Sequence, residues 1–359
     1  MIRERLRAAN LRWLPRRLLF PPEWLVLGVN NVCNLHCLMC DVGLGRSETV
    51  FARNLTGAEP RDMPLELATL IFDQAARYFP KVRIGFAFTE PLIWPHLEAA
   101  VAAARDRGLY SAVTTNGLNL GVRGPALAEA GLDEIFVSLD GPDEVHDHIR
   151  GRRGSFRRAV EGLERLAVHP ARPRMSVHCV LTPWNVGHLA RFVEAVGHLP
   201  LDRVGFMHAN FTTPEMAAAH NRRWGKLYPA TPSNLGPLQP GEMDLDRLLD
   251  ELGALRALEP AFLLTFSPNL TDREGLERFY LRPGEPIGRG CSDVHRTLMI
   301  KSDGAAIPAH GRCYEVPVGH VGRQTLPEIW NSAAMARLRR DLARAGGLLP
   351  ACTRCCSAF

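Results

Sequence analysis

The sequence contains no run of about 18 apolar residues, so a membrane-spanning helix is not expected. It also lacks a secretory signal, because arginines interrupt every apolar stretch before Leu18 and two prolines follow. These absences predict a cytoplasmic protein, in which a disulfide framework is not expected. With 46% hydrophobic and 23% charged residues in 359, the composition is that of a globular chain and excludes extensive disorder.

Most of the chain lacks net charge. The first 17 residues contain six arginines and one glutamate, which accounts for the whole net charge of +5. The balanced remainder excludes a nucleic-acid-binding surface spread over the body of the chain. We interpret residues 1–23 as a basic N-terminal leader, which is either a solvated helix docked on the rest of the protein or an element that binds a membrane surface or an acidic partner.

Three of the nine cysteines lie close together near the start of the chain, with the spacing Cys33-x3-Cys37-x2-Cys40. They follow an apolar run, Trp24–Val29, that predicts a strand. Three thiolates on one short loop can hold three irons of a cubane cluster and leave the fourth iron without a protein ligand. Neither the paired cysteines of a structural zinc site nor the spacing of a two-cluster ferredoxin fits this run.

Hydrophobic periodicity after this loop predicts alternating strands and helices. Strands are predicted over Trp24–Val29, Val82–Phe88, Tyr110–Thr115, Glu134–Leu139, Met175–Leu181 and Arg203–Met207, and helices over Leu65–Tyr78, Leu97–Arg105, Ala126–Ala130, Phe156–Ala167 and Leu189–Val196. Such alternation predicts parallel βα units. The segment is shorter than the roughly 250 residues of a complete eight-unit barrel. The fold class predicted is α/β, a partial (β/α)6 TIM-like barrel.

The cysteine loop resembles the signature of the radical S-adenosylmethionine (SAM) superfamily. The resemblance implies that Cys33, Cys37 and Cys40 bind a 4Fe–4S cluster whose open iron chelates SAM. Reductive cleavage of SAM then yields methionine and a 5′-deoxyadenosyl radical. The sequence departs from the family at Met39, where an aromatic residue is usual, although a thioether can also pack on a purine.

Polar residues after the predicted strands carry the rest of the resemblance. Phe88-Thr89-Glu90-Pro91 stands where the family usually has Gly-Gly-Glu-Pro, which binds the SAM amino group. By the same resemblance, we expect SAM contacts from Thr89, Glu90, Asn116, Ser138, Asp140 and Arg150. For any one segment alone, a simple strand-end turn is an adequate explanation, because Asn-Gly and Asp-Gly are common turn formers.

The last part of the chain contains Cys291, Cys313, Cys352, Cys355 and Cys356. Together with Leu326–Asn331 and a helix predicted over Ala334–Ala345, it resembles the SPASM domain or its shortened twitch form. Five cysteines are too few for two auxiliary clusters, so one auxiliary 4Fe–4S cluster is predicted. The expected ligands are Cys291, Cys313, Cys352 and Cys355, with Cys356 as a substitute for Cys355. A four-cysteine zinc site is the alternative.

The predicted organisation has four parts: the leader at 1–23, the barrel at 24–224, a linker and loop/helix region at 225–285, and a SPASM/twitch-like domain of hairpin and helix at 286–359. Two long loops, Asp41–Met63 and 225–242, are expected to carry substrate contacts.

Two residues are candidates for catalysis. Cys179 on the fifth strand is either a core cysteine or a hydrogen-atom donor, as in some epimerases of the superfamily. Strand alternation sends His178 and Cys179 to opposite faces. His208, at the end of the sixth strand, is expected at the barrel mouth, where it is either a structural histidine or one that binds substrate or takes a proton.

The resemblance therefore implies a radical SAM oxidoreductase or epimerase. The substrate predicted is a small polar molecule such as a sugar, aminocyclitol or nucleoside. The alternative is a ribosomally synthesised peptide, and a remote one is a non-catalytic iron–sulfur or zinc protein. The implied partner is an electron donor such as flavodoxin or ferredoxin, which is usually acidic and would suit the basic leader.

Overall fold

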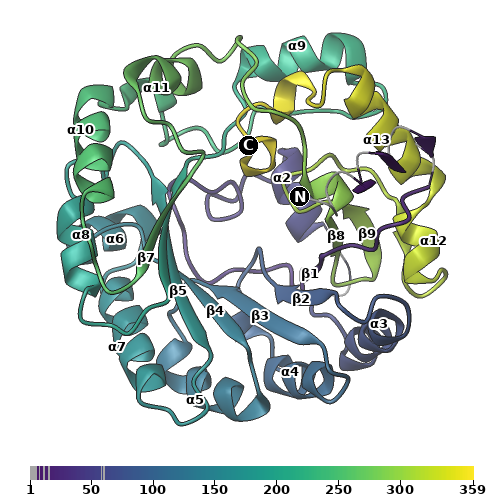
Figure 1. The fold of residues 1–359 in the computed structure, drawn as a ribbon, viewed down its shortest axis with the longest axis horizontal. Coiled ribbons are helices and arrows are strands. Elements are labelled where there is room, and N and C mark those ends of the chain that lie inside the picture. The colour runs from purple at the N-terminus through teal and green to yellow at the C-terminus, as the bar shows by residue number, and fades with distance from the viewer. Residues whose placement is uncertain (1–5, 8, 11–12, 15–16, 58, 60) are drawn as a thin grey trace.

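The computed structural model describes residues 6–7, 9–10, 13–14, 17–57, 59 and 61–359. These residues contain one sheet of ten strands in the order β10-β9-β8-β1-β2-β3-β4-β5-β6-β7 (Figure 1). The strands are β1 (Trp24–Leu27), β2 (Arg83–Phe86), β3 (Tyr110–Thr115), β4 (Glu134–Ser138), β5 (Arg174–Leu181), β6 (Arg203–His208), β7 (Leu263–Ser267), β8 (Thr297–Ile300), β9 (Ala305–Pro308) and β10 (Gly319–His320).

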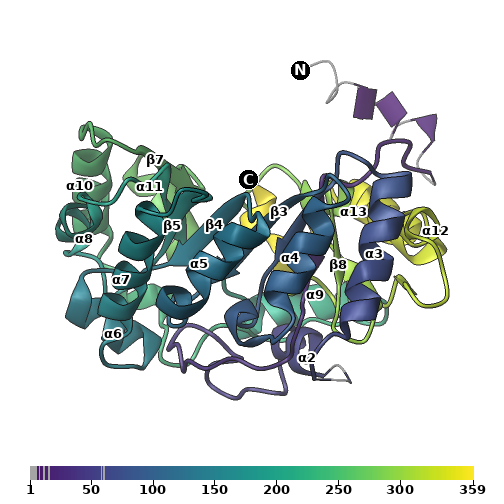
Figure 2. The same ribbon diagram turned by 90° about the horizontal axis from the view of Figure 1, so that it is seen from below.

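Helices connect the parallel strands and cover the outer face of the curved sheet, as Figures 1 and 2 show. They are α3 (Leu65–Tyr78), α4 (Leu97–Arg105), α5 (Leu120–Ala130), α7 (Ser155–Ala167), α8 (Leu189–Val196) and α10 (Leu245–Arg256). In α3 the buried residues Ala68, Ile71, Phe72 and Ala75 recur at helical spacing, so one stripe packs on the sheet. This outer layer is the main hydrophobic core.

The predicted partial barrel is confirmed, and several helices and strands have the predicted bounds, among them α3, α4 and β3. The sheet also holds a seventh βα strand, β7, in the region interpreted as linker and loop/helix. In addition, β8 pairs in parallel with β1, with Leu298 beside Leu25. The C-terminal hairpin therefore extends the barrel sheet and does not form a sheet of its own.

Further helices lie around the carboxyl ends of the strands and in the C-terminal region. They are α2 (Val50–Thr56), α6 (Asp143–Arg150), α9 (Pro214–Trp224), α11 (Arg273–Tyr280), α12 (Leu326–Trp330) and α13 (Ala333–Arg344). The two long loops expected near substrate are tied together, because the backbone N–H of Asn234 donates to both carboxylate oxygens of Asp41, at 2.9 and 3.0 Å. Arg46 adds a hydrogen bond to the carbonyl of Leu235 at 2.9 Å.

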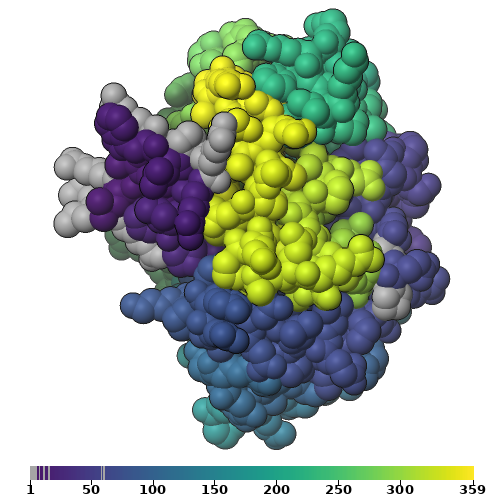
Figure 3. All heavy atoms as spheres, turned by 90° about the vertical axis from the view of Figure 1, so that its right-hand side faces the viewer, coloured from purple at the N-terminus to yellow at the C-terminus, as the bar shows by residue number. Residues whose placement is uncertain are grey.

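The N-terminal leader lies against the C-terminal region, as the contact of purple and yellow atoms in Figure 3 shows. The backbone N–H of Leu18 donates to Asn331, and the indole of Trp330 donates to the carbonyl of Phe20. Arg7 forms an ion pair with Glu23 at 2.9 Å. Arg3, Arg5, Arg12 and Arg16 lie outside the described residues. Among the described helices, none combines the length and apolarity needed to cross a membrane.

Candidate functional site

The cysteine loop leaves the carboxyl end of β1 and is fixed to the end of α6. The backbone N–H of Leu38 donates to the carbonyl of Ile149 at 2.9 Å, and that of Cys40 to Cys37 at 3.1 Å. Gly151 has a φ of 66°, and a Cβ there would lie 2.6 Å from the carbonyl oxygen of His36. A glycine is therefore needed where α6 ends, because it allows the cysteine loop to approach closely.

The three thiols of this loop lie near one another, and they are buried or half-buried. Burial raises the pKa of Cys37 to about 12, and the proximity of Cys40 and Cys33 adds to the rise. Cys37 also accepts a hydrogen bond from Arg150, with 3.8 Å between Nη1 and Sγ. Buried thiols of this kind ionise when a metal provides the compensating charge. The donor set of three cysteines fits a cubane cluster that keeps one iron open.

Glu90 joins the end of β2 to the end of β3. Its side chain is buried and accepts hydrogen bonds from the backbone of Leu92 (2.9 Å) and Asn116 (2.8 Å) and from the hydroxyl of Thr115 (2.6 Å). Burial raises the pKa of Glu90, and these three bonds oppose the rise. The side chain thus positions the neighbouring strand end, and its backbone carbonyl accepts from Asn30.

Thr89 and Asn116, both expected to contact SAM, form hydrogen bonds with the cysteine loop and with the segment that leads into it. The hydroxyl of Thr89 is hydrogen-bonded to the carbonyl and side chain of Asn30, and Asn116 donates to the side chain of Asn34 at 2.8 Å. Both residues are mostly buried. Two neighbouring strand ends therefore meet the cysteine loop in one polar cluster.

Asp140 and Arg150 form a buried ion pair beside the same loop, with 2.6 Å between Oδ2 and Nε. Asp140 also accepts a hydrogen bond from the backbone of Val180. Burial alone would lower the pKa of Arg150, but the Asp140 carboxylate and the Cys37 sulfur outweigh this effect and raise it. The structure thus brings these two predicted SAM contacts together as partners of each other.

One register row runs across the inner face of the barrel. Ser138 of β4 pairs with His178 of β5, His178 with Gly205 of β6, and Gly205 with Thr265 of β7. The imidazole of His178 stacks on Phe136, with ring centroids 4.9 Å apart. Val137, which lies between Phe136 and Ser138 in β4, is fully buried in the core under the helices. Because successive side chains of a strand alternate in direction, Phe136 and Ser138 face the other way, into the barrel, and so does His178, the register partner of Ser138.

His178 was not singled out from the sequence, although strand alternation already separated it from Cys179. Gly205 leaves room for it, since a Cβ there would lie 3.0 Å from the His178 ring. Burial, and to a lesser extent Arg203, lower the pKa of His178 to about 4. The imidazole is therefore neutral at pH 7 and can accept a hydrogen bond.

Cys179 and His208 lie on the opposite face, toward the helices. Cys179 is fully buried and pairs in register with Phe206, whose ring meets Phe192 of α8 edge-on at 6.2 Å. His208 hydrogen-bonds Tyr280 of α11 at 2.7 Å. The structure does not bring either side chain to the inner row that holds Ser138.

The C-terminal cysteines form a second site. Cys291, Cys313, Cys352 and Cys355 line one cavity, which His310 and Tyr314 also border. Burial raises the pKa of Cys352 to about 11, and burial together with the other cysteines raises that of Cys313 further. This donor set fits a fully cysteine-ligated cluster or a four-cysteine zinc ion.

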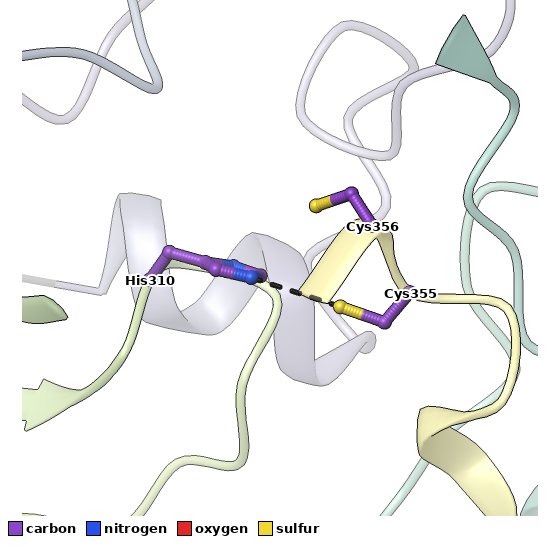
Figure 4. A group of neighbouring side chains, drawn as sticks. All are labelled: His310, Cys355 and Cys356. Carbon is purple, nitrogen blue, oxygen red and sulfur yellow. Dashed lines mark hydrogen bonds between the residues drawn. The ribbon is translucent and has the colours of Figure 1, made fainter. Parts of the chain in front are cut away.

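Cys356 lies beside this cavity and is not part of its wall. Its sulfur, that of Cys355 and a ring nitrogen of His310 lie within 4.8 Å of one another (Figure 4). Cys356 is exposed, whereas Cys355 is half-buried. The placement favours Cys355 over Cys356 as the fourth ligand.

Phe88 stands between the two cysteine sites. It has a φ of 88°, a conformation that L-residues other than glycine rarely adopt. Its ring stacks on His310 of the second site, with centroids 5.9 Å apart. It also packs, together with Cys40, against a small apolar cluster that includes Phe51 and Met299. Phe88 thus contacts His310 of the second site and shares an apolar cluster with Cys40 of the first.

Two protein-family models match the regions of the chain that contain the two cysteine sites. Residues 28–196 match the model of the radical SAM superfamily, and residues 291–356 match SPASM, an iron–sulfur cluster-binding domain. These domains imply 4Fe–4S clusters.

Two similar solved structures cover most of the chain. One is Streptococcus suis SuiB bound to the precursor peptide SuiA, which is 15% identical with a TM-score of 0.63 and covers 98% of this chain and 75% of SuiB. Another is anSMEcpe with bound AdoMet and Cp18Cys peptide, which is 17% identical with a TM-score of 0.58 and covers 88% of this chain and 82% of anSMEcpe. At these identities the likeness shows the fold alone.

Proposed function

Because the chain belongs to the radical SAM superfamily and ends in a SPASM iron–sulfur cluster-binding domain, we propose that it is a peptide-modifying enzyme that abstracts a hydrogen atom from a C–H bond. The observation that carries the radical SAM part of the proposal is the presence of two cysteine sites. The first contains three thiols at the barrel mouth, and the second contains four thiols in the C-terminal cavity.

The first site would hold a 4Fe–4S cluster on Cys33, Cys37 and Cys40. When bound, this group supplies the electron that cleaves SAM to a 5′-deoxyadenosyl radical. The polar cluster of Thr89 and Asn116, and Ser138 on the inner row, would orient SAM beside it. Glu90 and the Asp140–Arg150 pair would act by fixing the strand ends and the loop in place.

The second site would hold one auxiliary cluster on Cys291, Cys313, Cys352 and Cys355. A fully ligated cluster has no open iron and supplies one-electron chemistry. Oxidation at carbon needs a proton acceptor as well, and we assign that role to the neutral imidazole of His178, whose register partner in the inner row is Ser138. We therefore assign the substrate-facing position to His178, ahead of Cys179 and His208, which face the helices.

The choice of a peptide over the small polar molecule predicted from the sequence is supported by the solved structures of similar fold. SuiB was solved with the precursor peptide SuiA, and anSMEcpe was solved with the Cp18Cys peptide. Both structures match this chain over most of its length. The loops at residues 41–63 and 225–242, which are hydrogen-bonded to each other, would line the substrate-binding site.

The proposal is tested by anaerobic reconstitution with iron and sulfide, followed by reduction with dithionite in the presence of SAM. Formation of 5′-deoxyadenosine is expected even without substrate, and its absence in protein with assembled clusters contradicts the radical SAM activity. Adding the peptide fraction or the small-molecule fraction of the source cells then separates the substrate classes. Stimulation by the small-molecule fraction alone contradicts a peptide substrate.

A further inference from the structure

The four-cysteine cavity contains a hydrogen bond that the ligand set does not require. We propose that Tyr314 donates a hydrogen bond to the Cys352 sulfur of the auxiliary cluster and so raises the potential at which that cluster accepts an electron. The proposal rests on the auxiliary cluster of the proposed function and assigns a positioning residue to it.

The hydroxyl of Tyr314 lies 2.9 Å from the sulfur of Cys352. Tyr314 directly follows the ligand Cys313 in the chain, but the sulfur that it contacts belongs to a segment 38 residues further on. Both residues lie at the cavity wall, and only 6% of Tyr314 is exposed. A sulfur that ligates a metal carries no proton, so in the loaded site the hydroxyl is the donor.

A second acceptor for this hydroxyl is nearby but further away. His220 stacks on Tyr314, with ring centroids 5.0 Å apart and an angle of 25°, and its Nδ1 lies 3.5 Å from the hydroxyl. The Nε2 of His220 lies 2.6 Å from the carbonyl of Tyr228, which can only accept, so Nε2 carries the proton and Nδ1 is an acceptor. The backbone N–H of Ala351 also donates to this Nδ1, at 3.5 Å. The distance of 3.5 Å is at the limit of a hydrogen bond, so the sulfur is the better acceptor.

His310 is a weaker second donor on the other side of the cavity. Its Nδ1 accepts from the backbone of Arg312, which places the proton on Nε2. That nitrogen lies 2.9 Å from the hydroxyl of Ser357 and 3.7 Å from the sulfur of Cys355. Because the Ser357 hydroxyl donates to Asp293, it is free to accept from His310, and the bond to sulfur is secondary.

The effect of the Tyr314 bond follows from the charge of the cluster. One-electron reduction adds a negative charge that is shared with the ligand sulfurs, so a donor to sulfur stabilises the reduced form more than the oxidised form. If the bond is stronger by roughly 1.4 kcal/mol in the reduced state than in the oxidised state, the ratio of reduced to oxidised cluster rises about tenfold, which corresponds to about 59 mV for a one-electron couple.

The test is a redox titration of the reconstituted full-length protein, in which electron paramagnetic resonance follows the auxiliary cluster. Tyr314→Phe removes only the hydroxyl. Tyr228→Phe is the matched control, because Tyr228 lies in the same aromatic stack, 5.6 Å from Tyr314, and its hydroxyl donates to Asp341 instead of a sulfur. We expect a more negative midpoint for Y314F and an unchanged midpoint for Y228F.

An unchanged midpoint in Y314F with full iron content overturns the proposal, as does an equal shift in both variants. If Y314F does not retain iron, wild-type protein produced with 3-fluorotyrosine is titrated instead. The fluorinated hydroxyl is the stronger donor, so the midpoint must rise, and a midpoint that stays unchanged rejects the role of Tyr314. A wild-type protein that assembles no second cluster instead contradicts the auxiliary cluster itself.

Discussion

Ser138 and His178 lie side by side in register on neighbouring strands, and both face the interior of the barrel. Ser138 is the expected SAM contact in the row that runs from β4 to β7, and His178 is the next side chain along that row. On the function proposed above, this row would pass from the SAM site toward the substrate.

Replacing His178 with Asn should lower substrate-dependent turnover at least tenfold, because the proton acceptor is lost, a loss typical of general-base removal. Formation of 5′-deoxyadenosine without substrate should be unchanged, since it needs only the cysteine loop and SAM. His198→Asn, on the surface where His198 contacts Glu164, is the matched control. Equal loss of both activities in H178N would place His178 in the SAM site instead.

Stability of the metal-free protein should fall as the pH drops from about 6.5 to about 4. Burial lowers the pKa of His178 to about 4, and that of His208 to about 3, so the folded chain stays unprotonated where the unfolded chain binds protons. Each such histidine adds a slope of up to about 1.4 kcal/mol per pH unit. Urea unfolding at several pH values measures this slope, and His178→Gln should reduce it. A slope that H178Q leaves unchanged contradicts a buried neutral imidazole.

Replacing Arg150 with Met should destabilise the protein by about 3 kcal/mol, because it leaves the buried Asp140 carboxylate without its partner. The double variant Asp140→Asn with Arg150→Met removes both charges and should recover part of that loss. Urea midpoints of the two variants provide the comparison. A double variant that is less stable than R150M would show that Asp140 is stabilised mainly by its other hydrogen bond, to the backbone of Val180.

Phe88→Gly should be more stable than Phe88→Ala by about 1 kcal/mol, because only glycine adopts a φ of 88° without strain. Both variants remove the same ring contact with His310, so the difference isolates the backbone. Thermal or urea unfolding measures it. If F88A equals or exceeds F88G in stability, the left-handed conformation is absent from the protein in solution.

Cys355→Ala should lose about half of the iron, whereas Cys356→Ala should retain it, since about four irons belong to each cluster. The reason is that Cys355 lines the cavity with the other three cysteines and Cys356 does not. Iron and sulfide analysis after anaerobic reconstitution decides between them. Zinc in place of iron at the second site would favour the zinc alternative, and loss of iron from C356A alone would exchange the two assignments.

Much of the barrel could be predicted from the sequence, because buried parallel strands and one-sided helices leave clear hydrophobic periods. The strand β7 was missed for the opposite reason: its residues are half-exposed at a sheet edge, and no apolar period marks it. Alternation placed His178 and Cys179 on opposite faces but could not say which face was inner. Only the packing of Val137 and Phe206 against the helices decides that, and it depends on residues distant in the sequence.

The ion pair between Asp140 and Arg150 could not be predicted from local sequence patterns either. The sequence indicated both residues separately, by resemblance, as contacts for SAM. The helix α6 between them, which was not predicted, turns Arg150 back toward Asp140 and Cys37. The contact of Phe88 with His310 likewise joins the barrel to the C-terminal region. Neither sequence segment, taken alone, predicts this contact.

The parallel pairing of β1 with β8 has a consequence for how the protein assembles. β1 ends just before the cysteine loop, and its second neighbour in the sheet is about 270 residues away in the chain. Until β8 is synthesised, β1 presents an open edge with unpaired backbone groups, the kind of edge that recruits other chains. Pairing at such a separation also slows folding. During biosynthesis, the first cluster site is therefore bordered by a temporary edge that the last quarter of the chain must close.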